Sequence, residues 1–89
     1  MDMAYVYILK GMNKEKYYVG STNDLVRRLK EHQQGKVMST KFMLPLELAF
    51  KKECLSLSEA RKAELKIKKW KRKDFVEKVI MNQRLEFKN

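Results

Sequence analysis

The chain has 89 residues, 44% of them hydrophobic, which leaves room for one small domain with a single core and excludes a second domain. The formal net charge is +10, from 21 lysines and arginines against 11 acidic residues. This excess indicates a polyanionic partner, with nucleic acid ahead of an anionic membrane, because basic side chains placed on phosphates release condensed counterions.

Zinc ligands are scarce in this chain, which has one cysteine, Cys54, and one histidine, His32. A single cysteine forms no intramolecular disulfide and indicates a reducing compartment. Zinc sites usually need three or four such ligands, so any metal should be a hard ion bound by oxygen. No apolar run approaches the roughly 20 residues of a membrane span, and no signal peptide is evident. We expect a cytoplasmic protein that does not bind membranes.

The first element expected is a β-hairpin. Residues 4–10 and 17–21 are rich in β-branched and aromatic side chains, and Gly11 marks the turn between them. Strands joined by so short a loop pair antiparallel, with side chains that alternate between the two faces. Tyr5 and Tyr7 should therefore share one face of the sheet.

A helix is expected next, over residues 22–34. Thr22 or Asn23 can cap its start, and Gly35 can stop it. The following residues, 38–44, fit no regular pattern.

The second half of the chain predicts a strand and two helices. Residues 46–53 alternate between apolar and polar side chains, as in a strand with one buried face. Residues 56–59 form a capping box, and apolar residues recur at helical spacing from there to Trp70. A last short helix is expected at 75–80, followed by a frayed tail at 84–89.

These elements predict an α+β fold with the order β-β-α-β-α-α. Three strands should form a small antiparallel sheet flanked by helices. A single domain is expected over residues 1–83.

Arg28 is the first candidate site residue. At 100° per residue it shares a helix face with His32 and two leucines, whereas Arg27 points to water. An inward guanidinium is costly unless an anionic or aromatic group meets it; the alternatives to a functional role are a structural acid or a side chain that extends to the surface. His32 follows one turn later and, with an ordinary pKa near 6.5, suits a base at neutral pH, although a lone histidine is more often structural.

Glu64 is the only acid in a strongly basic segment, residues 61–73, which has eight lysines and arginines. A salt bridge to Lys68, four residues later, is the ordinary explanation for such a residue. Glu64 also lies at the edge of the apolar face of its helix, where an inward carboxylate needs a partner, and a hard cation fits that need. We therefore predict a metal ligand at Glu64, with the salt bridge as the alternative.

Positive charge is concentrated in the segment 61–73, which supplies +7 of the net +10. Lysine-rich helices are common as solvated surfaces, but they usually interleave acids and this one does not. Contacts from such a segment hold a phosphate backbone without reading its sequence. The predicted nucleic-acid contacts are Arg27, Lys66, Lys68, Lys69, Lys71, Arg72 and Lys73.

The candidate residues form an ordered set that resembles the GIY-YIG nuclease superfamily. Tyr-Val-Tyr at 5–7 stands for the first motif and Tyr-Val-Gly at 18–20 for the second, and Arg28, His32 and Glu64 follow in order. The family places its catalytic arginine ten residues after the second-motif tyrosine, as here. The chain is most similar to the small stand-alone bacterial members, which are related to the N-terminal catalytic domain of the excinuclease.

The resemblance implies a metal-dependent endonuclease that acts on DNA more readily than on RNA. Glu64 would bind one Mg²⁺ or Mn²⁺ ion, weakly without substrate, and Arg28 would stabilise charge on the phosphoryl group. Tyr18, with Tyr7 or His32, would activate the attacking water. A phenol with a pKa near 10 needs a cation beside it to act as a base at pH 7, and Arg28 or the metal is the expected cation.

Two departures from the family pattern keep a second function open. Some members have a lysine shortly after the second motif and an asparagine beyond the metal-binding glutamate, whereas this chain has Ser21 and no such residue near Val76. The alternative is a catalytically weak or inactive module that binds nucleic acid through residues 61–73. The sequence leaves oligomeric state and protein partners open.

Overall fold

The computed structural model describes residues 3–13, 15–70 and 73–83. Lys71, Arg72 and the tail expected at 84–89 lie outside the described residues. The elements are, in chain order, β1 (Ala4–Gly11), β2 (Tyr17–Thr22), α1 (Leu25–Gln33), the 3-10 helix η1 (Lys41–Met43), β3 (Leu46–Cys54), α2 (Leu57–Trp70) and α3 (Lys73–Asn82). The predicted α+β class and the order β-β-α-β-α-α are confirmed.

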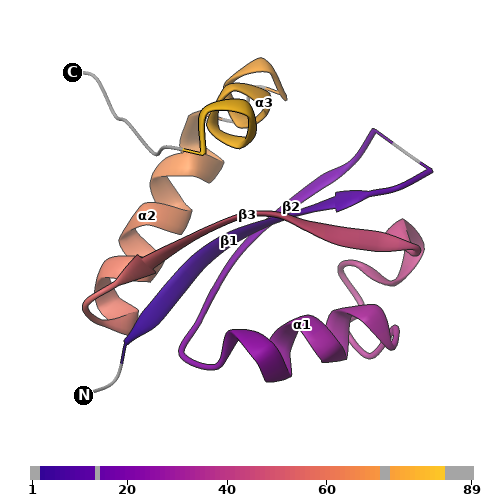
Figure 1. Cartoon of the computed structure of the whole chain (residues 1–89), viewed down its shortest axis with the longest axis horizontal. Helices are drawn as coiled ribbons and strands as arrows, with labels where there is room; N and C mark the ends of the chain where they lie inside the picture. The colour runs from indigo at the N-terminus through magenta and orange to yellow at the C-terminus, as the bar shows by residue number, and fades with distance from the viewer. Residues whose placement is uncertain (1–2, 14, 71–72, 84–89) are drawn as a thin grey trace.

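A three-stranded sheet forms the centre of the molecule, in the order β2-β1-β3, and both pairings are antiparallel. Helix α1 lies on one side of the sheet, and α2 and α3 lie on the other (Figure 1). Because both faces are covered, the central strand β1 is buried nearly throughout. Among its residues from Ala4 to Leu9, only Tyr5 is partly exposed.

Alternating side chains of β1 divide the interior into two apolar clusters. Val6 and Ile8 belong to the cluster covered by α2 and α3. Tyr7 and Leu9 belong to the cluster on the α1 side of the sheet. Tyr5 lies on the same face of β1 as Tyr7, as predicted, but its hydroxyl donates to the Glu53 carboxylate at the surface, 3.0 Å away.

The start of α1 differs from the prediction. Asp24, not Thr22 or Asn23, is the N-cap, and its Oδ1 accepts a hydrogen bond from the backbone N–H of Arg27 at 3.2 Å. Thr22 still belongs to β2, and its hydroxyl accepts from the backbone N–H of Asp24 at 3.0 Å. Aspartate also caps helices more strongly than threonine does, so the helix begins at Leu25.

The segment after α1 turns back toward the helix. Gly35 has φ of +74°, a left-handed conformation that ends the helix as predicted. The backbone N–H of Thr40 then donates to the carbonyl of Val37 at 3.1 Å, and η1 follows directly. This turn leaves the Thr40 side chain fully buried.

The capping box predicted at residues 56–59 opens α2. The backbone N–H of Glu59 donates to Ser56 Oγ at 3.2 Å, and the Glu59 carboxylate accepts from the backbone N–H of Leu55 at 3.1 Å. Among the described helices, none combines the length and the hydropathy that crossing a bilayer requires.

Gly20 lies opposite Tyr7 in the β1–β2 pair, and its missing side chain makes room for the tyrosine ring. A Cβ atom at this position would lie 2.6 Å from Tyr7 Oη and 3.0 Å from Cε2 of Tyr18. Tyr7 is fully buried, so its ring has little freedom to move aside. We expect Gly20→Ala to lower the free energy of unfolding, measured by urea titration, by about 1–3 kcal/mol.

A matched control is Val26→Ala on α1, because the Val26 side chain is exposed. This variant should stay within about 0.5 kcal/mol of the wild type. A Gly20→Ala protein as stable as the wild type would contradict the close approach of Tyr7 to β2.

Candidate active site

The structure brings four of the predicted site residues together in one place. Tyr7 comes from β1, Tyr18 from β2, and Arg28 and His32 from α1. The ring centroids of the two tyrosines lie 6.5 Å apart, and the His32 ring lies 5.8 Å from Tyr7 and 5.2 Å from Tyr18. Three separate segments of the sequence therefore meet at one aromatic cluster.

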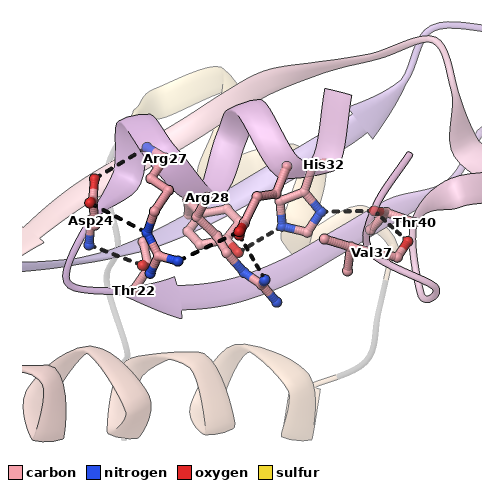
Figure 2. Close-up of polar contacts among 9 residues, drawn as sticks. Thr22, Asp24, Arg27, Arg28, His32, Val37 and Thr40 are labelled. Atoms are coloured by element: carbon pink, nitrogen blue, oxygen red, sulfur yellow. Dashed lines mark hydrogen bonds and ion pairs between the residues drawn. The ribbon is translucent and has the colours of Figure 1, made fainter. Parts of the chain in front are cut away.

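A line of hydrogen bonds runs through the interior beneath α1 (Figure 2). The Tyr7 hydroxyl lies 2.9 Å from His32 Nε2, and His32 Nδ1 lies 2.8 Å from the hydroxyl of Thr40. Thr40 in turn donates to the carbonyl oxygen of Val37 at 3.4 Å. Tyr7, His32 and Thr40 are all fully buried. His32 is thus a satisfied buried residue that is also bonded directly to a site tyrosine.

Arg28 lies on the inner side of α1 and Arg27 on the outer side, as predicted. Their side chains are 36% and 61% exposed, respectively. The Arg28 guanidinium donates to Glu31 Oε1 at 3.2 Å and lies close enough to the Tyr7 hydroxyl to influence its pKa. Burial lowers the pKa of Arg28, but the bonds to Glu31 and Tyr7 raise it by more. A structural acid, Glu31, is therefore present beside Arg28, and the same guanidinium lies near Tyr7 in the candidate site.

Burial raises the pKa of the Tyr7 hydroxyl to about 12, and the neighbouring Tyr18 adds to this shift. The hydrogen bond from Arg28 acts in the opposite direction, but burial outweighs it. Arg28 by itself therefore does not bring the pKa of Tyr7 below its ordinary value of 10. Tyr7 is a neutral phenol at pH 7, and its hydroxyl lies against the His32 imidazole.

Burial also sets the charge state of His32. It lowers the pKa of the imidazole below its ordinary value of 6.5, the charge on Arg28 lowers it further, and Glu31 raises it. His32 is consequently a neutral imidazole at pH 7. A neutral imidazole has a lone pair that can accept a proton.

The carboxylate of Glu64 lies beside the edge strand β2. Ser21 donates to its Oε1 at 2.5 Å, and Lys68 Nζ lies 2.5 Å from its Oε2. The side chains of Glu64 and Lys68 are 19% and 46% exposed. The Lys68 ammonium also lies 5.9 Å from the centre of the Tyr18 ring, which links Glu64 to the aromatic cluster. The salt bridge to Lys68, the alternative predicted for Glu64, is therefore present.

A metal ion at Glu64 would have few protein ligands. Within the part of the chain that the structure describes, no three histidine, cysteine or carboxylate side chains come together. Glu64 Oε2 already attracts one cation, the Lys68 ammonium, so its charge and position fit a cation. Mg²⁺ commonly keeps several waters and takes one or two carboxylates together with substrate phosphates, and one carboxylate fits that pattern.

Ser21 and Thr40 are site neighbours that the sequence did not reveal. Ser21 replaces a family lysine, but alternation along β2 places it on the opposite face from Tyr18, where it meets Glu64. That alternation is the signal that could have identified it. Thr40 lies in a segment without regular pattern, so no periodicity indicated the direction of its side chain.

The predicted nucleic-acid contacts are divided between the two sides of the sheet. Three of them are exposed on α2, namely Lys66, Lys68 and Lys69. Lys73 is the first residue of α3. Arg27 belongs to α1, across the sheet, where it pairs with Asp24 and Glu31 at 3.5 Å each.

Comparison with known proteins agrees with the sequence resemblance. The family model of the GIY-YIG catalytic domain matches residues 3–78. A UPF0213 protein of Streptococcus pneumoniae serotype 4 is 37% identical over 81 residues, which span 90% of this chain and 81% of the relative. UPF0213 protein YazA of Bacillus subtilis is 39% identical over 70 residues, which span 78% of this chain and 70% of the relative. A UPF0213 protein of Syntrophus aciditrophicus is 36% identical over 84 residues, which span 92% of this chain and 95% of the relative. No solved structure matches the chain.

His32 gives the stability of the fold a pH dependence of definite sign. Its pKa is lowered in the native state and returns to about 6.5 in the unfolded chain, so just below that pH the unfolded state binds more protons. The stabilisation is complete above the unfolded pKa and is lost as the pH falls toward the folded pKa. Urea titrations between about pH 8 and pH 5 should show a falling free energy of unfolding on the acid side.

The matched control for this dependence is His32→Gln, which keeps a hydrogen-bonding side chain but does not titrate in this range. Its free energy of unfolding should change less steeply below the ordinary histidine pKa. An equally steep fall in this variant would assign the pH dependence to other groups.

Proposed function

The chain belongs to the GIY-YIG family, and we propose that it is a metal-dependent endonuclease that hydrolyses phosphodiester bonds in DNA. Family membership implies an activity of the nuclease type. The observation that supports the proposal best is the buried bond between Tyr7 and His32 beside the Arg28 guanidinium, since a proton acceptor and a cation meet at one phenol. The residues proposed for catalysis are Tyr7, Tyr18, Arg28, His32 and Glu64.

In this proposal His32 is the base, and Tyr7 carries the proton to it. An attacking water gives a proton to the Tyr7 oxygen while the phenolic proton passes to His32 Nε2, 2.9 Å away. The pKa values favour this order, because Tyr7 resists ionisation by itself and His32 starts neutral. Tyr18, whose half-buried ring contacts both residues, orients the water.

Arg28 is proposed to stabilise the charge that builds up on the phosphoryl oxygens. Its side chain is 36% exposed, so it can meet a phosphate while it stays bonded to Glu31 and close to Tyr7. A planar guanidinium binds phosphate through two parallel N–H groups. Such a contact lowers the barrier when it is stronger in the transition state than in the ground state.

Glu64 is proposed to bind the metal ion, Mg²⁺ or Mn²⁺. When bound, this ion supplies charge stabilisation at a phosphate oxygen and at the leaving oxygen. Ser21 would orient the carboxylate through its bond to Oε1, and Oε2, which now pairs with the Lys68 ammonium, would be the oxygen available to a cation. Because Glu64 would be the one protein ligand proposed, binding of the ion should be weak without substrate.

Exposed lysines on α2 are proposed to hold the nucleic-acid backbone. Lys68 lies one turn from Glu64 on the same side of α2, so a backbone held there passes close to the carboxylate, whereas Lys66 and Lys69 extend the basic surface around the helix. Contacts of this kind position phosphates without reading bases. Binding should therefore weaken steeply as the salt concentration rises.

A nucleic-acid-binding module without turnover is the competing function. It is favoured by the ion pair between Glu64 and Lys68, which satisfies the carboxylate without any metal. Both functions need the basic surface of α2, and both lose affinity as salt rises. A cleavage assay distinguishes the nuclease from the binding module, whereas a binding assay does not.

The nuclease proposal is tested with labelled linear, nicked, flapped and branched DNA in Mg²⁺, Mn²⁺ or EDTA. We expect metal-dependent cleavage that falls at least about 100-fold in Glu64→Gln and in Arg28→Ala, because each change removes stabilisation of transition-state charge. Glu77→Gln is the matched control, since Glu77 is exposed on α3, a helix without a proposed catalytic residue. This control should cut at the wild-type rate.

Binding of the same DNAs, followed by fluorescence anisotropy, should persist in all three variants. A wild-type protein that binds the DNAs and cuts none of them in either metal would favour the binding module and overturn the nuclease proposal.

Competition between Lys68 and the metal ion is tested by Lys68→Met, which keeps the aliphatic stem and removes the ammonium. A partly exposed ion pair of this kind contributes up to about 1 kcal/mol, so its loss should raise the Mn²⁺ affinity of Glu64 about fivefold. Mn²⁺ titration followed by electron paramagnetic resonance measures this without DNA. Lys69→Met, at the next exposed position of α2, is the control for net charge and should have nearly wild-type affinity. Unchanged affinity in Lys68→Met would show that the ammonium does not compete.

A further inference from the structure

Both ring nitrogens of His32 are engaged in the interior of the protein. Nε2 lies 2.9 Å from the Tyr7 hydroxyl, and Nδ1 lies 2.8 Å from the Thr40 hydroxyl. A neutral imidazole carries one N–H and one lone pair, so one of these bonds is donated by the ring and the other is accepted by it. Which nitrogen carries the proton is decided by the two hydroxyl groups.

Thr40 decides the direction of the bond at Nδ1. Its hydroxyl has one proton, and this proton is donated to the carbonyl oxygen of Val37 at 3.4 Å. A carbonyl oxygen only accepts hydrogen bonds, so in this contact the hydroxyl is the donor, in addition to the backbone N–H groups of Thr40 and Lys41 that Val37 also accepts. The Thr40 oxygen consequently presents a lone pair to Nδ1, which must then carry the N–H.

Tyr7 favours the same arrangement from the other side of the ring. The Arg28 guanidinium has only donors and lies near the Tyr7 oxygen, so it favours that oxygen as an acceptor and leaves the phenolic proton available for His32 Nε2, 2.9 Å away. The reverse tautomer would place two donors, Nε2–H and the guanidinium, on the Tyr7 oxygen. The phenolic proton would then lose its partner in a buried setting, which is unfavourable, whereas the Val37 carbonyl would keep the backbone N–H groups of Thr40 and Lys41.

We propose that Thr40 is a positioning residue that holds His32 in the tautomer with the proton on Nδ1, so that Nε2 accepts the hydroxyl proton of Tyr7. The tautomer follows from the hydrogen bonds alone, whereas its catalytic use rests on the proposed nuclease function. In that use one proton moves from water to the Tyr7 oxygen and one from Tyr7 to Nε2. Tyr7 ends unchanged, and the resulting imidazolium keeps its Nδ1–H bond to Thr40.

The inference is tested by NMR of protein labelled with ¹⁵N in the imidazole ring. Because the chain has one histidine, the spectrum contains the two ring nitrogens of His32 only. We expect a protonated Nδ1 and an unprotonated Nε2 at neutral pH in the wild type and in Thr40→Ser, which retains the hydroxyl. Thr40→Val keeps the shape of the side chain without the hydroxyl, and its ring should shift toward the Nε2–H tautomer. Ser39→Ala, at the exposed neighbouring position, should match the wild type.

A wild-type ring protonated at Nε2 would overturn the proposal, and this result needs no variant to fold. An unchanged tautomer in folded Thr40→Val would also overturn it. These readouts do not depend on cleavage, so the tautomer can be established even if the protein proves to be a binding module.

The catalytic consequence is measured as the pH profile of cleavage. Thr40→Val should cut about 10- to 100-fold more slowly, as is typical when a partner that orients a functional histidine is lost, and Thr40→Ser should recover most of the rate. The acid limb of the profile should move in Thr40→Val, because its imidazolium lacks the Nδ1 partner. The other groups facing His32, namely Arg28, Glu31, Tyr7 and Tyr18, are unchanged in both variants. The role of Thr40 would be packing alone if Thr40→Val cuts more slowly without a shift in the acid limb of its pH profile, and if Thr40→Ser does not recover the rate.

Discussion

The hydrogen bond between Tyr7 and His32 is the interaction on which the rest of the site depends. It joins the central strand to α1, and both side chains are buried, so each polar group depends on the other as a partner. Gly20 makes the approach possible, because a Cβ atom there would collide with the Tyr7 ring. The same burial raises the pKa of Tyr7 to about 12 and lowers that of His32, so both partners are neutral at pH 7.

Strand β2 divides the site into two parts. It is an edge strand, and its alternating side chains place Tyr18 with the aromatic cluster on the α1 side and Ser21 against Glu64 on the α2 side. The Lys68 ammonium bridges the two parts, since it pairs with Glu64 and lies over the Tyr18 ring. Under the proposed function, a phosphate at this edge meets the proton-transfer pair on one side and the metal-binding carboxylate on the other.

Local patterns in the sequence correctly predicted the order of the elements and the inner face of α1, because helix and strand periodicity depend on residues close together in the chain. They placed Arg28 inward and Arg27 outward correctly. They did not predict that Asp24 caps α1, because Thr22 is held in β2, or that Thr40 turns back onto His32, because that contact depends on the turn after Gly35. Local patterns also did not predict the high pKa of Tyr7, because this pKa depends on the balance between burial and the charge on Arg28 in the packed structure.

The most direct test of the central claim is the pH dependence of single-turnover cleavage by the wild type and by Tyr7→Phe. The variant keeps the buried ring and lacks the hydroxyl that connects water to His32. We predict that the wild-type rate falls on the acid side with a pKa below that of an ordinary histidine, and that Tyr7→Phe cuts at least about 100-fold more slowly. A Tyr7→Phe protein that cuts at the wild-type rate would contradict proton transfer through the buried pair.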